Sequence, residues 1–202
     1  MDPMVEMFLS AQRAFADRVH AVRDDHWHQP TPDTDWDVAA LVGHLIEENR
    51  WVPPLVHGHD FDAAAKIVEG TRSLPADGGV GGNLTQEWDE ASVACADAVR
   101  EDGALDRTAA LSRGPTPVHE YITEMMFDHV VHAWDLETAI GYHGDPLPED
   151  LVATVYEMAK PMAPMLAGSG LFADPVEVPD DASTLDKLLG LTGRDPNAKP
   201  GG

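Results

Sequence analysis

The chain has 202 residues, 43% of them apolar, and carries 36 acidic against 13 basic side chains, for a formal charge of −23. This length and apolar fraction suffice for one sizeable domain, or one domain with a short appendage, and exclude a disordered chain. The strongly negative field repels phosphate groups, so neither nucleic acid nor a membrane surface is expected as a partner.

A single cysteine, Cys95, excludes an internal disulfide framework and a Cys-x-x-Cys zinc site, and it fits a reducing compartment. The N-terminus lacks a charged-then-apolar signal pattern, and no apolar run reaches the roughly 18 residues needed to span a bilayer. We therefore expect a cytoplasmic protein.

Apolar periodicity predicts two helices in the first quarter of the chain. The first covers 4–24 and the second 36–52, with apolar residues recurring every three to four positions. Thr34, followed three positions later by Asp37, resembles a capping box before the second helix. The proline pair at 53–54 is expected to end or kink that helix.

The middle of the chain predicts two further helices. A Gly-rich loop at 75–83, "PADGGVGGN", either borders a substrate opening or simply connects two helices. The third helix covers 84–101. After the loop "SRGPTP" (112–117), a fourth helix is expected over 117–140, closed by Gly141 at the usual C′ position.

The last quarter is less regular. A helix near 148–166 is strained by Pro161 and Pro164, and a short last helix is expected near 182–191. Between them, "DPVEVP" is the one segment with a convincing strand-like alternation. The chain is therefore predicted to be mainly α.

The fourth helix contains "EMMFDHVVHAWDL" (124–136), in which polar side chains interrupt an apolar arc. On a helical wheel, Asp128 and His132 are four positions apart and project together from one edge of that arc. Glu124 and Asp135 continue the same row, whereas His129 lies near the centre of the apolar arc.

The second helix carries His44 at the margin of its apolar stripe, with Glu48 and Trp51 nearby. If the two helices pack in a bundle, His44, Asp128 and His132 can converge. Two imidazoles and one carboxylate with open positions are typical of catalytic metal sites, which bundles build from facing helices. From spacing alone, a hydrogen-bond network at the edge of the core is the open alternative.

Two stretches carry a resemblance to a known family. "TPDTDWDVAALVGHL" (31–45) and "DHVVHAWDLETAIG" (128–141) resemble the DinB-like metalloproteins, in particular the actinobacterial branch that includes the N-terminal domain of mycothiol-dependent maleylpyruvate isomerase. The tail "PVEVPDDASTLDKLLGLTGRDP" resembles the ending of short members of this branch. The resemblance implies a DinB-like four-helix bundle with a short C-terminal helical extension.

On this basis we divide the chain in two. Residues 1–145 are expected to form the metal-binding bundle, and residues 146–202 a helical extension packed on it. The tail at about 195–202 is expected to be flexible.

The resemblance also implies one divalent metal, with zinc as the first choice and iron or nickel as alternatives, held by His44, Asp128 and His132. We expect Asp135 to orient a ligand by a hydrogen bond rather than to bind the metal.

Three positions depart from the relatives. Asp33 stands where this branch often has cysteine. His129 replaces an apolar residue and is either a base or extra ligand, or a buried, hydrogen-bonded histidine. Glu48 replaces a small residue and is either a general base or a solvated acid.

The expected function is therefore that of a metal-dependent, mycothiol-dependent isomerase or thiol S-transferase. Its partners would be a low-molecular-weight thiol and a small-molecule electrophile, with Glu48 and His129 as tentative acid/base groups. Cys95 lies on an apolar helix and fits a small core residue. Trp134, away from the apolar arc, could cover a pocket or an oligomer contact, so a homodimer is an option.

Two rivals stay open. The first is a non-catalytic DinB-like protein that binds metal or a small ligand, because a fold does not fix a function. The second is a facial-triad iron enzyme, because two histidines and one carboxylate also suit Fe(II).

Overall fold

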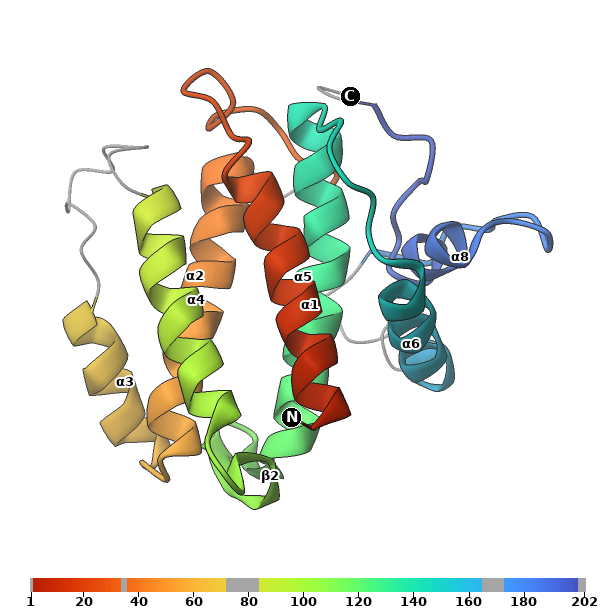
Figure 1. Ribbon diagram of the computed structural model, residues 1–202. Coiled ribbons are helices and arrows are strands. Elements are labelled where there is room, and N and C mark those ends of the chain that lie inside the picture. The colour runs from red at the N-terminus through yellow and green to blue at the C-terminus, as the bar shows by residue number, and fades with distance from the viewer. Residues whose placement is uncertain (1, 34–35, 72–83, 165–172, 200–202) are drawn as a thin grey trace.

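Four long helices form the body of the molecule in this computed structural model, which describes residues 2–33, 36–71, 84–164 and 173–199 (Figure 1). They are α1 (Pro3–Val19), α2 (Val38–Val56), α4 (Leu84–Arg100) and α5 (Val118–Ile140). α1 packs against α4 and α5, and α2 packs against the same two helices, so that α1 and α2 occupy opposite corners. The chain is thus mainly α, with the DinB-like four-helix bundle predicted from the sequence.

Residues at the helix termini explain where three of these helices begin or end. Asp2 caps α1 by accepting a hydrogen bond from the backbone N–H of Met4, and Asp37 caps α2 by accepting one from Ala40. Gly141 ends α5 with a φ of 62°, the left-handed conformation that glycine adopts without a steric cost. The predicted partner of Asp37 at this cap, Thr34, lies outside the described residues.

Two predicted helix ends were wrong. α1 ends at Val19 rather than at 24, because the following residues form tight turns and the side chain of His26 binds the backbone N–H of Arg23. α2 continues through Pro53 and Pro54 to Val56. The prolines lie in its last turn, where their carbonyl oxygens still accept hydrogen bonds from His57 and His59.

Two elements had no counterpart in the sequence prediction. Helix α3 (Phe61–Thr71) buries only Ala64 and Val68 well, too few to give a clear apolar period. A hairpin of β1 (Thr108–Leu111) and β2 (Gly114–Pro117) replaces the predicted loop 112–117. Its strands are four residues each and β2 holds two prolines, so the usual strand pattern is missing.

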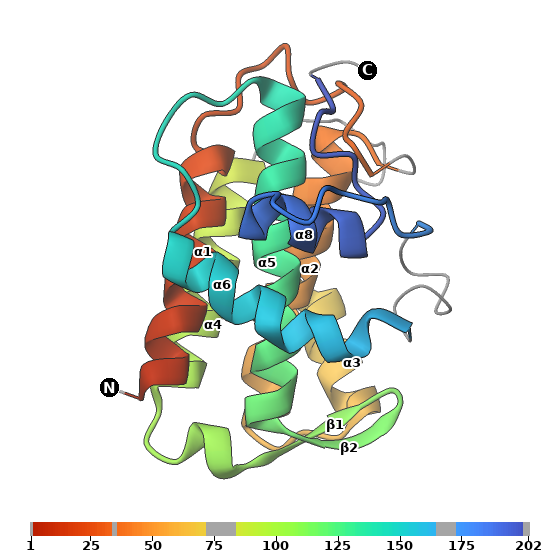
Figure 2. The same ribbon diagram turned by 90° about the vertical axis from the view of Figure 1, so that its right-hand side faces the viewer.

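The C-terminal part crosses the outer side of α5 (Figure 2). Helix α6 (Glu149–Ala159) passes into a short 3-10 turn, η2 (Lys160–Met162), where Pro161 interrupts the longer helix predicted for 148–166. Helix α8 (Thr184–Leu191) begins at its Ser183 cap and packs against α6. The described part of "DPVEVP" forms no strand, which corrects that expectation. Among the described helices, none is both long and apolar enough to span a bilayer.

Candidate metal centre

One cavity of about 800 Å³ lies between α2 and α5, flanked by the hairpin and by the end of α6. Its volume falls within the range typical of ligand sites. His44 and Glu48 from α2 line it together with Asp128 and His132 from α5. The two helices predicted to share a site therefore do face a common space.

The two histidines of the predicted ligand set are neighbours. The ring centroids of His44 and His132 are 5.5 Å apart, with the rings nearly perpendicular. Trp36, from the segment that leads into α2, lies over both: its ring is 4.6 Å from that of His44 and 5.5 Å from that of His132. This indole shields the imidazoles on one side.

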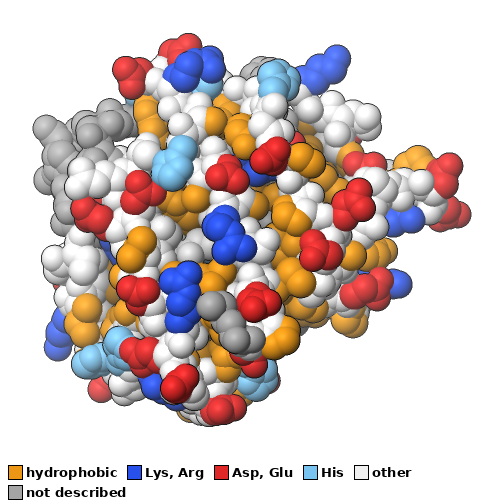
Figure 3. Space-filling model, in the orientation of Figure 1, with side chains coloured by type: hydrophobic (Ala, Val, Ile, Leu, Met, Phe, Trp, Pro, Cys, Tyr) orange, Lys and Arg blue, Asp and Glu red, His pale blue; other side chains and the backbone are white. Residues whose placement is uncertain are grey.

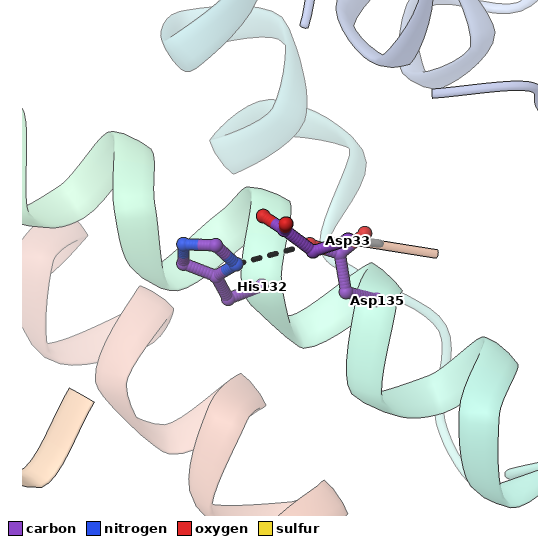
Figure 4. A group of neighbouring side chains, drawn as sticks. All are labelled: Asp33, His132 and Asp135. Atoms are coloured by element: carbon purple, nitrogen blue, oxygen red, sulfur yellow. Dashed lines mark hydrogen bonds and ion pairs between the residues drawn. The ribbon is translucent and has the colours of Figure 1, made fainter. Parts of the chain in front are cut away.

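His132 is hydrogen-bonded to Asp135, with Asp33 close by (Figure 4), and Arg194 links the two carboxylates. The Nδ1–H of His132 donates to Asp135 Oδ2 at 3.0 Å, which fixes the tautomer and leaves Nε2 with its lone pair. Arg194 Nη2 donates to Oδ2 of both Asp135 and Asp33, each at 2.9 Å, and Arg194 Nε donates to Asp135 Oδ1 at 3.2 Å. Asp135 is completely buried, so this guanidinium compensates its charge.

Asp33, His132 and Asp135 form the tightest ligand-type cluster in the described part of the chain, with one donor atom from each within 4.8 Å of the others. This trio shares only His132 with the predicted one, and the donor atoms of His44, Asp128 and His132 do not meet the same spacing. Because Arg194 already bridges both carboxylates, we interpret the trio as an ion-pair network that supports His132 rather than as the metal site itself.

The charges of the cavity influence one another. Burial lowers the pKa of His44 to about 4, and the neighbouring His132 adds to the decrease. Burial raises the pKa of Glu48 to about 7, and the charge of Asp128 adds to the increase. The pKa of Asp128 is itself raised, chiefly by burial. For Asp135, burial opposes ionisation, but the hydrogen bond from His132 and the charge of Arg194 outweigh it and lower the pKa.

The chemistry of these cavity side chains, though not the spacing of their donor atoms, suits a divalent cation. A neutral imidazole is the ligand form of histidine, and His132 carries the carboxylate partner that usually accompanies metal-binding histidines. The charge of Asp128 raises the pKa of Glu48, and the charge of Glu124 raises the pKa of Asp128, which is the signature of excess negative charge that a cation would offset. His44, Asp128 and His132 are the residues that could hold it.

His129 lies elsewhere, in the centre of the bundle and fully buried. Its Nδ1–H donates to the carbonyl of Met125 at 2.6 Å, and its Nε2 accepts from the amide of Asn49 at 3.1 Å. Asn49 in turn accepts from Gln12 at 2.8 Å. Both nitrogens of His129 are thus engaged, and the ring is absent from the cavity lining within the described residues. Glu48 is therefore the better acid/base candidate.

Cys95 is buried on α4, and burial raises the pKa of its thiol far above the usual value. Trp134 is buried as well, at 7% exposure. Neither side chain lines the cavity in the described part of the chain.

Two contributors to the site were missed by sequence reasoning. Trp36 belongs to the quoted motif, but its position in that motif gave no sign that it lies over the imidazoles. Arg194 gave no signal, because it is 59 positions from Asp135 in an irregular segment.

These features define a mainly α bundle with a His/carboxylate cavity between two of its helices. The sequence model of the family described as "Mycothiol maleylpyruvate isomerase N-terminal domain" matches residues 8–137, and the chain belongs to this family. Among curated proteins it is 30% identical over 199 residues to the uncharacterized proteins MT0763 and Rv0738 of two Mycobacterium tuberculosis strains, covering 96% of this chain and 98% of each relative.

Two solved structures share the fold. The crystal structure of mycothiol-dependent maleylpyruvate isomerase is 17% identical with a TM-score of 0.59, and that of a histidine-to-alanine mutant is 16% identical with the same score. Each match covers 100% of this chain and 82% of the isomerase chain. At this level of identity the match supports the fold, and the family model supports a mycothiol-related protein.

Proposed function

We propose that the chain is a metal-dependent enzyme that uses mycothiol, either as an isomerase or as a thiol S-transferase. His44, Asp128 and His132 would hold one divalent cation, with zinc as the first candidate and iron or nickel as alternatives. The observation that supports this proposal is that all three side chains line one cavity with Glu48 beside them. The family assignment supports the thiol.

Each residue of the site has a separate task. Asp135 and Arg194 keep His132 in one tautomer and one orientation, and Trp36 limits the access of water to the two imidazoles. Preorganisation of this kind lowers the cost of assembling the reactive groups. The cavity volume of about 800 Å³ leaves room for a thiol and a small electrophile.

A cation held by these residues would supply Lewis-acid activation of a bound thiol at neutral pH. Glu48 lines the same cavity and would accept the proton that the thiol loses. The thiolate would then add to an activated double bond. Its later departure gives isomerisation, whereas protonation of the adduct gives S-transfer.

Metal analysis tests the ligand set. Protein purified without added metal should contain one equivalent of a divalent ion by mass spectrometry, and its identity separates zinc from a facial-triad iron centre. His132→Ala and His44→Ala should abolish stoichiometric metal. His129→Ala, whose ring lies in the bundle centre, should retain it. Equal loss in all three variants would show that the ligand assignment is wrong.

A thiol-dependent screen tests catalysis. Metal-loaded protein should consume electrophiles only in the presence of mycothiol, and Glu48→Gln should slow turnover while the metal content stays constant. If the protein showed no turnover and no thiol binding, the rival function would be the one left, that of a non-catalytic protein that binds metal or a small ligand. A cytoplasmic location and a homodimer remain predictions.

A further inference from the structure

The cavity has an apolar half that the proposed chemistry does not use. Its walls include Trp51 and Leu55 of α2, Phe61 at the start of α3, Leu111 of β1 and Met158 of α6. The rings of Trp51 and Phe61 stack with centroids 5.0 Å apart and 13° between their planes. Phe61 is 38% exposed, so this aromatic surface is available to a ligand.

The polar half of the cavity is acidic. Four carboxyl groups line it, those of Asp33, Glu48, Glu124 and Asp128. Among the described lining residues the one cationic side chain is Arg113. Its Nη2 is held by both carboxylate oxygens of Glu124, at 2.6 and 2.7 Å. Arg113 is paired with Glu124 and Asp33 is paired with Arg194, so a divalent cation would have only the carboxyl groups of Glu48 and Asp128 left to offset.

Such a lining opposes a doubly negative substrate. A carboxylate that leaves water needs a cationic or hydrogen-bonding partner to offset the loss of its hydration. Here the guanidinium of Arg113 already has its partner, and Arg194 is engaged by Asp33 and Asp135. Maleylpyruvate, the substrate in the name of the structurally similar isomerase, carries two carboxylates.

We propose that the electrophile of this chain is an uncharged, conjugated alkene with an apolar or aromatic substituent, and not a dicarboxylate. The inference rests on the proposed function and names its substrate class. The reactive double bond would lie near His44 and His132, with the apolar substituent against Trp51 and Phe61.

The reaction balances without any redox partner. The thiolate sulfur bonds to one alkene carbon while the π electrons move to the conjugated carbonyl oxygen. The remaining C–C single bond rotates, the C–S bond breaks, and the electron pair returns to re-form the alkene in the trans geometry. No proton or electron is consumed in isomerisation. In S-transfer, the proton lost by the thiol is returned to the adduct carbon.

The test uses two electrophiles with the same carbon skeleton, one a neutral diester and the other a dianion. Dimethyl maleate is neutral and maleate is a dianion, and both isomerise from cis to trans, which NMR or ultraviolet absorbance can follow. With metal-loaded protein and mycothiol, kcat/KM relative to the uncatalysed thiol reaction should favour the ester about 100-fold, because an unpaired polar group discriminates strongly. Equal values, or a preference for maleate, would overturn the proposal.

Two matched variant pairs locate the cause. Glu124→Gln frees Arg113 and should reduce the preference for the ester about tenfold. The control Glu90→Gln removes the same charge from an exposed position on α4 and should not change the preference. Phe61→Ala should raise the KM for the ester several-fold, while Ile67→Ala, on the exposed side of α3, should leave it unchanged. If the test variant and its control had the same effect in either pair, the role assigned to that part of the cavity lining would be wrong.

A binding measurement separates this proposal from the proposed function. Dimethyl succinate and succinate have the same charges as the two electrophiles but cannot accept a thiolate. Tryptophan fluorescence quenching should show at least about tenfold tighter binding of the ester, even if no electrophile turns over. Tighter binding of succinate, or no binding of either compound, would contradict the inference independently of catalysis.

Discussion

Arg194 offers the sharpest test of how the site is held together. Its guanidinium, itself 5% exposed, donates to Asp135 through two nitrogens and to Asp33 through one. Arg194→Met keeps most of the side-chain length but removes the cation. Asp135, which is completely buried, then loses the cation that pairs with it and keeps only the hydrogen bond from His132.

The magnitude follows from the burial. Removing one partner of a buried ion pair costs about 3–5 kcal/mol, because the remaining charge is left without compensation. Asp135→Asn should cost a similar amount, since it removes the completely buried carboxylate that pairs with Arg194, and the remaining carboxylate partner, Asp33, is only half-buried. The double variant removes both charges, so it should be more stable than the sum of the single effects predicts, by about 2–3 kcal/mol.

Urea unfolding of the full chain, followed by circular dichroism, gives these free energies. The matched control is Arg113→Met, which breaks an ion pair whose side chains are 54% and 44% exposed. An exposed pair of this kind contributes about 1 kcal/mol or less. Strictly additive effects for Arg194 and Asp135, or a cost no greater than that of the control, would refute the coupling.

The other predictions address the bundle and the thiol. Asn49→Ala leaves Gln12 and the Nε2 of His129 without their partner in the core, so unfolding in urea should show a loss of about 2–5 kcal/mol; an effect below 1 kcal/mol would contradict the network. Cys95 should not react with Ellman's reagent until the chain is unfolded, and Cys95→Ala should keep any thiol-dependent turnover; fast native labelling would contradict its burial. Two glycines should respond with opposite sign in thermal unfolding: Gly43→Ala, inside α2 with no atom within 4 Å of the new Cβ, should stabilise by up to about 1 kcal/mol, and Gly141→Ala, at a φ of 62°, should destabilise by about 1 kcal/mol.

The long helices were predictable because each buries a continuous apolar stripe. α4 and α5 match their predicted ranges to within about a residue at each end, and Gly141 ends α5 as expected. α3 was not predictable, since two well-buried residues do not make a stripe. The hairpin was not predicted for a related reason. Prolines 115 and 117 are typical of loops, and the pairing of β1 with β2 is a tertiary property.

The cavity, like the fold, has parts that the sequence pattern could predict and parts that it could not. The spacing of Asp128 and His132 placed them on one face of α5, and His44 was placed at the margin of α2, so their common lining could be anticipated. Spacing relates only residues that share a helix. It could not bring Trp36 over the imidazoles. The helical wheel did separate His129 from His132, because it placed His129 near the centre of the apolar arc, and His129 is indeed a buried, hydrogen-bonded histidine that faces the bundle centre.

The contact of Arg194 changes how the two predicted parts of the chain relate to the site. The family match ends at residue 137, and the predicted bundle ends at 145, so both exclude this arginine. Yet its guanidinium donates two hydrogen bonds to the carboxylate that orients His132, and without it that carboxylate would be buried beside a negatively charged cavity. Proton transfer from the His132 imidazole to Asp135 is also opposed by the arginine, because its positive charge keeps the carboxylate ionised. The C-terminal segment therefore takes part in building the cavity: it supplies the charge that allows a buried aspartate to hold a histidine at the cavity's edge.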